Sequence, residues 1–379
     1  AWIEAAGFYL QRRKNDAAEQ ELKTGLQHTD KSVKLRMALG ELYANTGRVD
    51  QAVALLKECL GLAKDAASPE AIQAKNALAK IALARQDLAE AKKYADEVLK
   101  ESPKNADALF TRGTVYLLRG EAAGAVPDFR SVVTENPQNI AAHIRLAEAH
   151  ALNGESNLAM DTLKAAQRID PKSREINRAL ARQHARQRNM REAENSLRTI
   201  LQANPNDLEV IAELGDLYMA TRDVKRAEAQ YAEVKRRAPN APIGYVKMAG
   251  LAAAQGKWDK AVPELEQALK TSPQADPVTA MLAQAYVRTS KPAKALALAD
   301  ERIAKNPGDA FAWNLKGEIQ MTQRDRAGAE VSFRKAIELQ PLWQAPHGNL
   351  AGLLLAQGKK DAAIGQLEAL IKFNPDNLG

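Results

Sequence analysis

The sequence contains a single cysteine, Cys59, among its 379 residues. One cysteine excludes an internal disulfide and a cysteine-based zinc site. Aromatic residues make up only 5% of the chain, so its apolar surface must be buried through many thin contacts rather than one aromatic core. No apolar run approaches the roughly 18 residues that a membrane-spanning helix requires.

The excess of positive over negative charge is also modest. The net charge is +7 with a pI near 9.2, which neither demands nor excludes a nucleic-acid partner. Hydrophobic residues make up 45% and charged residues 27%, a composition that excludes a disordered chain. The sequence starts at Ala1 without a methionine or a signal-peptide pattern, so we expect a mature or excised segment.

A period of 34 residues runs through the chain. Prolines follow it at positions 103, 137, 171, 205, 239, 273, 307, 341 and 375. One alanine register keeps the same phase: Ala18, Ala52, Ala91, Ala125, Ala159, Ala193, Ala227, Ala261, Ala295, Ala329 and Ala363. Another Gly or Ala lies twelve residues before each of these alanines. Such a period indicates a stack of similar structural units.

Each unit has the pattern of two amphipathic helices. In residues 106–139, Leu109 and Tyr116 belong to the first helix, Gly120 interrupts the pattern, and Phe129 belongs to the second. The proline ends the second helix, because the residue before proline is disfavoured in the α region. Candidate N-caps recur after it: Asn105, Asn139, Ser173, Asp207, Asp309 and Asn377.

These residues resemble the tetratricopeptide repeat family. The family pattern of a large residue, Leu-Gly, Tyr, Ala, Phe, Ala and Pro is matched in 310–343 by Trp313, Gly317, Ala329, Phe333, Ala336 and Pro341. In 208–241 it is matched by Leu214, Gly215, Tyr218, Ala227, Tyr231 and Pro239. The resemblance implies an all-α, right-handed superhelix of about eleven helix-turn-helix units. Their expected bounds are 1–32, 33–66, 72–105, 106–139, 140–173, 174–207, 208–241, 242–275, 276–309, 310–343 and 344–377.

Two departures from the repeat carry expectations. Residues 67–71 are extra, and Ser68-Pro69 has the form of a cap followed by a first-turn proline. We therefore expect a longer helix there and a hinge. Both ends of the sequence fall within the pattern without a polar capping helix, which predicts a segment of a longer protein or ends that meet partners, self-association included.

The resemblance further implies that the first helices line a concave groove, with the second, fifth, ninth, twelfth and thirteenth positions of each unit facing it. Arg178, Arg182 and Arg186 fall on such positions and form one stripe with Arg174, because residues four apart share a helix face. Residues 172–198 hold eight Lys or Arg against three Glu, an excess of five positive charges. A carboxylate, an acidic peptide or an anionic glycan would be attracted to this stripe.

A structural alternative stays open for the same charges. Glu148 and Asp216 occupy the ninth position in the units on either side of Arg182, so stacking could pair the three in a ladder between repeats. The other residues predicted to bind partners in the groove are Arg145, Glu213, Asp216, Lys247, Gln284, Asn314, Glu318 and Asn349.

Catalytic and cofactor motifs are missing. The sequence has no phosphate loop, no GxSxG and no HExxH, and its five histidines lack metal-ligand spacing. We therefore predict a non-enzymatic protein without cofactor or metal. The groove positions follow no one-base-per-unit rule, so nucleic-acid binding is disfavoured. The Lys/Asn/Arg clamp by which some members grip a chaperone's terminal carboxylate is also not matched.

The function that these observations favour is a protein-interaction scaffold. The alanine-rich units are similar in style to the repeat regions of bacterial exopolysaccharide export and assembly proteins. That likeness implies a cell-envelope scaffold and favours the periplasm over the cytoplasm. Two alternatives remain: a cytoplasmic adaptor that binds peptide segments, or the substrate-recruiting arm of an enzyme whose catalytic domain lies outside these residues.

Overall fold

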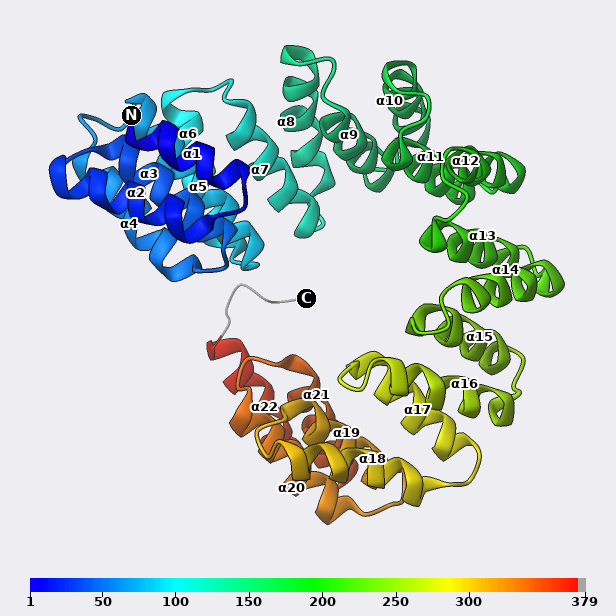
Figure 1. Cartoon of the computed structure of the whole chain (residues 1–379). Coiled ribbons are helices and arrows are strands. Elements are labelled where there is room, and N and C mark those ends of the chain that lie inside the picture. The colour runs from blue at the N-terminus through cyan, green and yellow to red at the C-terminus, as the bar shows by residue number, and fades with distance from the viewer. Residues whose placement is uncertain (374–379) are drawn as a thin grey trace. The chain divides into compact units, whose positions relative to one another are not determined.

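A computed structural model describes residues 1–373, which form 22 α-helices joined by short turns, with no strand (Figure 1). The helices are α1 (Trp2–Gln11), α2 (Asn15–His28), α3 (Val33–Asn45), α4 (Val49–Leu62), α5 (Pro69–Ala84), α6 (Leu88–Glu101), α7 (Ala106–Leu118), α8 (Ala122–Glu135), α9 (Ile140–Leu152), α10 (Ser156–Ile169), α11 (Arg174–Arg186), α12 (Met190–Ala203), α13 (Leu208–Ala220), α14 (Val224–Arg237), α15 (Pro242–Ala254), α16 (Trp258–Thr271), α17 (Asp276–Arg288), α18 (Pro292–Lys305), α19 (Ala310–Thr322), α20 (Arg326–Leu339), α21 (Gln344–Ala356) and α22 (Lys360–Phe373). The prediction of an all-α fold of paired helices is confirmed.

The predicted caps start their helices. The side chain of Asn105 accepts a hydrogen bond from the backbone N–H of Ala108 at 3.0 Å, which satisfies one orphan donor of α7. Asn139, Ser173, Asp207 and Asp309 do the same for α9, α11, α13 and α19. Asn377 lies outside the described residues. Ser68 caps α5, whose 16 residues confirm the longer helix expected after the insertion. The hinge at 67–71 stays a prediction.

The chain packs as two compact units that each contain several repeats. The first unit is residues 1–203 and the second unit is residues 204 onward. In each unit an odd-numbered helix pairs with the even-numbered helix that follows it, and consecutive pairs stack (Figure 1). Odd-numbered helices also contact one another, as α9 contacts α11 and α19 contacts α21; among the described helices no two even-numbered helices do so to a similar extent. Each stack therefore curves with its odd-numbered helices on the inner side. We call this side the groove face.

The alanine register forms the centre of both stacks. All eleven alanines that define it are at most 2% exposed. Larger side chains at other positions fill the remaining space, and Phe129, Phe333, Leu22 and Leu265 are among those that are fully buried. The small residues thus permit close helix approach, as their spacing predicted.

A second device recurs where one unit joins the next. In five units the fourth residue places a side-chain nitrogen or hydroxyl 2.9 to 3.0 Å from the carbonyl oxygen of the proline six residues earlier. These pairs are His143–Pro137, Asn177–Pro171, Tyr245–Pro239, Trp313–Pro307 and His347–Pro341. We call this contact the fourth-position cap. It covers a carbonyl in a loop that would otherwise lack a protein partner.

Candidate partner-binding groove

The arginine stripe lies on α11. Ile176, Leu180 and Gln183 are buried on the opposite side of this helix, so the stripe faces outward. Arg182 and Arg186 are exposed, and within residues 1–203 neither guanidinium makes an ion pair or a hydrogen bond. Arg178 is half-buried and is engaged with another group, as is Arg174. The stripe therefore divides into two engaged and two available arginines.

The two available arginines border a small cavity on the groove face. It has a volume of about 100 Å³, is lined by residues of α9, α10 and α11, and includes Glu148 in its lining. Apolar side chains, among them Ile144 and Leu163, form its floor. The cavity combines two exposed guanidinium groups with an apolar surface large enough for a side chain.

Glu148 does not pair with Arg182 inside the first unit. Its carboxylate instead accepts a hydrogen bond from Arg145 on the same helix, at 2.7 Å, and both side chains are about two-fifths exposed. The ladder alternative required a rung between Glu148 and Arg182, so this rung is wrong. The reason is local: three residues along one helix bring Arg145 within easy reach of Glu148.

In the second unit, Asp216 and Lys247 lie together. The Lys247 ammonium is 2.5 Å from one Asp216 oxygen and joins α13 to α15. The Tyr231 hydroxyl donates to the other oxygen at 2.6 Å. Burial, and then the nearby carboxylate, raise the pKa of Tyr231 far above its usual value. Asp216 is therefore held by groups of its own unit.

The structure also brings Asn314, Glu318 and Asn349 into one cluster. The Asn349 amide donates to the Asn314 side-chain oxygen and to Glu318, both at 3.0 Å, and the Asn314 amide donates to Glu318 at 2.8 Å. Asn314 is buried and Glu318 is exposed. The remaining predicted groove residues stay apart from this cluster in the hydrogen bonds described: Gln284 is exposed, and Glu213 has an interaction partner of its own.

Catalytic or metal chemistry finds little support in side-chain placement. Cys59 is fully buried, and this burial raises the pKa of its thiol to about 11. His150 is buried with Nδ1 2.5 Å from Glu155, and burial lowers the pKa of His184. No group of three His, Cys, Asp or Glu side chains in the described part of the chain could hold a metal ion.

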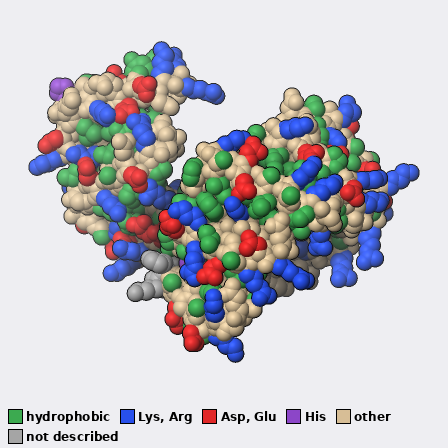
Figure 2. All heavy atoms as spheres, turned by 90° about the horizontal axis from the view of Figure 1, so that it is seen from below, with side chains coloured by type: hydrophobic (Ala, Val, Ile, Leu, Met, Phe, Trp, Pro, Cys, Tyr) green, Lys and Arg blue, Asp and Glu red, His purple; other side chains and the backbone are tan. Residues whose placement is uncertain are grey.

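Two surface properties complete the description. On the face shown in Figure 2, acidic and basic side chains intermix, so the positive net charge forms no single large patch there. Within residues 1–373, no helix combines the length and the apolar character needed to cross a membrane.

Stacked antiparallel helix pairs with an inner face of first helices define an α-solenoid protein. The chain belongs to the tetratricopeptide repeat family. Tetratricopeptide repeat models match residues 9–81, 116–182, 184–247 and 252–319, with further matches at 76–140 and 312–341. Members of this class are interaction modules that are typically non-catalytic, and the chain is accordingly a protein-interaction scaffold.

Solved structures share the fold at low sequence identity. A tetratricopeptide repeat protein from Parabacteroides merdae is 19% identical, with 67% of this chain and 98% of that chain covered and a TM-score of 0.55. Yeast Tom70 is 14% identical, with 99% of this chain and 90% of that chain covered and a TM-score of 0.53. No curated protein matches the sequence.

Proposed function

We propose that the groove face of the first unit binds an acidic segment of a partner protein, with Arg182 and Arg186 as the carboxylate-binding residues. The observation that carries this proposal is the pair of exposed guanidinium groups beside a cavity with an apolar floor. An arginine that is already paired with a carboxylate has little left to offer a ligand. Arg182 and Arg186 have no such partner in their own unit.

The chemistry of the cavity suggests the form of the ligand. Guanidinium groups bind carboxylates through two parallel hydrogen bonds, which gives direction as well as attraction. Arg182 and Arg186 are one helical turn apart, so they can hold two carboxylates at similar spacing. The floor formed by Ile144 and Leu163 suits an aliphatic side chain between those carboxylates. A segment that alternates acidic and aliphatic residues meets both requirements.

A binding measurement with paired peptides tests this proposal. The probe is a capped Glu-Leu-Glu-Leu-Glu peptide, and its Gln-Leu-Gln-Leu-Gln counterpart lacks the charge. We expect the acidic peptide to bind and the glutamine peptide to bind at least tenfold more weakly. The double variant Arg182→Ala/Arg186→Ala should lose most of the affinity, and wild-type affinity should fall as salt rises.

The matched control is Arg191→Ala, which removes one positive charge from an exposed position at the start of α12, a second helix. Affinity of this variant should stay within twofold of wild type. The single variants Arg182→Ala and Arg186→Ala each remove one charge as well. If Arg191→Ala lost as much affinity as either of them, net charge would be what attracts the peptide, and the groove site would be abandoned.

We also propose a place for this scaffold in the assembly or export of a bacterial cell-envelope polymer such as an exopolysaccharide. Its support is the similarity in style of the alanine-rich units to the repeat regions of such proteins. The full open reading frame tests the idea directly. A leader sequence together with an outer-membrane domain would support an envelope role. A reading frame that contains neither feature would support the cytoplasmic adaptor, and one that contains a catalytic domain would support the enzyme arm.

A further inference from the structure

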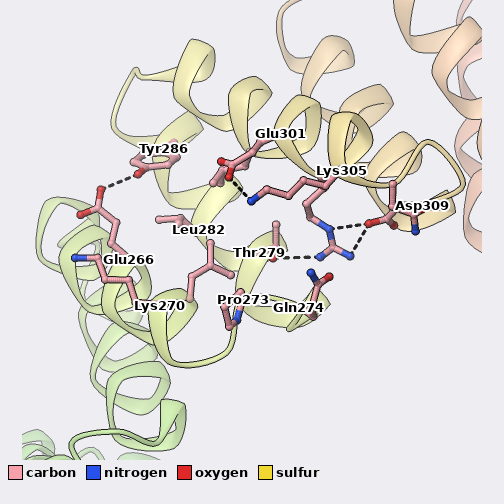
Figure 3. A pocket seen from close by; sticks show the side chains of 14 residues that line it. Glu266, Lys270, Pro273, Gln274, Thr279, Leu282, Tyr286, Glu301, Lys305 and Asp309 are labelled. Carbon is pink, nitrogen blue, oxygen red and sulfur yellow. Dashed lines mark hydrogen bonds and ion pairs between the residues drawn. The ribbon is translucent and has the colours of Figure 1, made fainter.

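A larger cavity lies in the second unit, between α16, α17 and α18 (Figure 3). Its volume is about 400 Å³, and its lining includes Leu269, Leu282 and Leu298. In Figure 3, Tyr286 points to Glu266 on one side, and Lys305 points to Glu301 on the other. Two of its three helices are second helices of their pairs, so the cavity is distinct from the groove-face cavity of the first unit.

The cavity occupies the place where other units form the fourth-position cap. The fourth residue of unit 276–309 is Thr279, and the proline six residues before it, Pro273, lines the cavity. Thr279 is too short to reach that proline. Its hydroxyl donates to the Ala275 carbonyl at 3.1 Å and accepts a hydrogen bond at 3.4 Å from Arg302, which also lines the cavity. Among the described residues, no hydrogen-bond donor reaches the Pro273 carbonyl. The Pro273 carbonyl, a hydrogen-bond acceptor without a protein donor, therefore lies beside a cavity large enough for an aromatic ring.

In units whose fourth residue is apolar, other groups fill this space or bind the proline carbonyl. Leu109 and Ile211 are buried at this position and fill the space with apolar side chains. The Pro205 carbonyl, which precedes Ile211, accepts a hydrogen bond from Arg237 at 2.6 Å. Among the fourth residues that the structure describes, Thr279 has the shortest side chain, and a cavity lies beside it.

A second position with a small side chain also distinguishes unit 276–309 from the others. The twenty-fourth residue is Leu, Phe or Tyr in nine units, and it is Ala in two, as Ala95 and Ala299. In the unit of Ala95 the fourth residue is Lys75, whose long side chain is buried and paired with Glu97 at 3.2 Å. Only unit 276–309 is short at both positions, and its helices α17 and α18 pack less closely than those of any other pair.

We propose that this cavity accepts a tryptophan side chain from a partner protein, whose indole N–H donates to the Pro273 carbonyl. The chain supplies the precedent itself, because Trp313 makes this contact with Pro307 at 3.0 Å. A phenylalanine would fill the space but leave the carbonyl without a donor. The apolar floor formed by Leu282 and Leu298 suits the flat faces of the ring.

A nearby cation supports an aromatic occupant. Lys270 lines the cavity, is exposed, and makes no ion pair within the described residues. In neighbouring units the ring at the fourth position lies beside a lysine: Lys235 is 4.9 Å from the centre of the Tyr245 ring, and Lys316 is 5.6 Å from that of Trp313. Lys270 lies one position later in its unit than Lys235 does, and its ammonium group is available at the cavity to a ring that enters from outside.

The test uses the full chain and short capped peptides as probes. The peptides are Gly-Trp-Gly, Gly-Phe-Gly and a third in which 1-methyltryptophan replaces the tryptophan of Gly-Trp-Gly. The methylated residue lacks the indole N–H. Binding is followed by chemical-shift changes of leucine methyl groups in NMR spectra. We expect saturable binding of the tryptophan peptide at millimolar concentration, and at least fivefold weaker binding of the other two.

Thr279→Trp and Thr279→His supply the matching variants, because other units already carry Trp or His at this position. Each should fill the cavity from within, lower the affinity for the tryptophan peptide at least tenfold and raise Tm. Thr134→Trp, an exposed position on α8, is the control and should change neither quantity.

Equal affinity of the tryptophan and 1-methyltryptophan peptides would overturn the role of the Pro273 carbonyl and with it the proposal. Unchanged affinity in both Thr279 variants, or no saturable binding, would do the same. Saturable binding of free indole without binding of the tryptophan peptide would identify a small aromatic ligand and overturn the protein partner. These outcomes leave the groove proposal untouched, because it concerns different residues in the other unit.

Discussion

The ring of Phe333 lies directly against the backbone of Gly317, so that a Cβ atom on Gly317 would be 2.5 Å from a carbon of the ring. Real Cβ atoms do not approach this closely. The same relationship holds for Gly113 opposite Phe129 and for Gly215 opposite Tyr231. Units that place leucine at the later position, such as the one with Leu265, have glycine or alanine at the earlier one. Aromatic rings at this position thus require glycine.

This relationship predicts the effect of one methyl group. Gly317→Ala should lower the free energy of unfolding by about 1–3 kcal/mol, because the added carbon forces the Phe333 ring or α19 to move. The double variant Gly317→Ala/Phe333→Leu should be more stable than the sum of the single effects predicts, since leucine accommodates the methyl group. Urea denaturation of the four proteins gives the coupling energy.

The control for this cycle is Gly352→Ala in α21, where an added Cβ would have no atom within 4 Å. This substitution should raise stability by up to about 1 kcal/mol, since alanine favours a helix more than glycine does. Additive effects of Gly317→Ala and Phe333→Leu would show that the two side chains are not in the close contact described.

Turns between paired helices offer a second prediction. The turn residue has a positive φ in both Arg324 (64°) and Gly358 (77°). A left-handed conformation costs a residue with a side chain roughly 1 kcal/mol, and glycine adopts it freely. Arg324 is exposed and makes no ion pair within the described residues. Arg324→Gly should therefore raise stability by about 0.5–1 kcal/mol, as measured by urea denaturation.

The reciprocal variant Gly358→Arg should destabilise the protein by a similar amount, because no neighbouring atom lies within 4 Å of its added Cβ and only the backbone is affected. A loss of stability in Arg324→Gly would mean that the arginine side chain contributes more than its backbone strain removes.

A partly buried ion pair supports the third prediction. Arg112 donates two hydrogen bonds to Asp128, at 2.7 and 2.8 Å, and a third to Asp96 at 3.1 Å. The Asp128 side chain is only 5% exposed. Arg112→Met should lower the free energy of unfolding by about 3 kcal/mol, because it leaves a buried carboxylate without its partner.

Adding Asp128→Leu to that variant should restore much of the loss, since the unpaired charge is then removed. Arg334→Met, which removes the pair between the exposed Arg334 and the half-buried Glu330, is the control and should cost no more than about 0.5 kcal/mol. Failure of the second substitution to recover stability would assign the loss to packing of the Arg112 side chain rather than to charge.

Much of this fold follows from the sequence because its determinants repeat. The alanine register, the caps and the proline spacing each depend on neighbours along the chain, so eleven similar units reinforce one interpretation. Ser68 before Pro69 likewise sets the start of α5 through local hydrogen bonding. The fourth-position cap was within reach of the same reasoning. A polar side chain six residues after a proline was its signal, in His143 and His347 as in Trp313.

The pairing of groove charges could not be predicted in the same way. Arg145 and Arg182 both lie near Glu148, and the choice between them depends on rotamers of long side chains whose energies differ little. The cavity beside Thr279 was missed for another reason. The short side chain of Thr279 is visible in the sequence, but the space beside it depends on how α16, α17 and α18 pack.

The last prediction concerns the stability of the first unit in acid. Hydrogen bonding to Lys23, followed by that to Arg48 and Tyr43, lowers the pKa of Glu19 from 4.5 to about 2, although burial opposes the shift. The ionised carboxylate therefore stabilises the fold above pH 4.5, and this contribution disappears as the pH falls toward 2. Between these limits wild type should lose on the order of 1 kcal/mol more stability than Glu19→Gln, after allowance for solvent screening.

Glu41→Gln, at an exposed position of α3, is the control and should follow wild type. Urea denaturation at several pH values measures the difference, and parallel curves for wild type and Glu19→Gln would show that the Lys23 and Arg48 contacts do not act on Glu19 in solution.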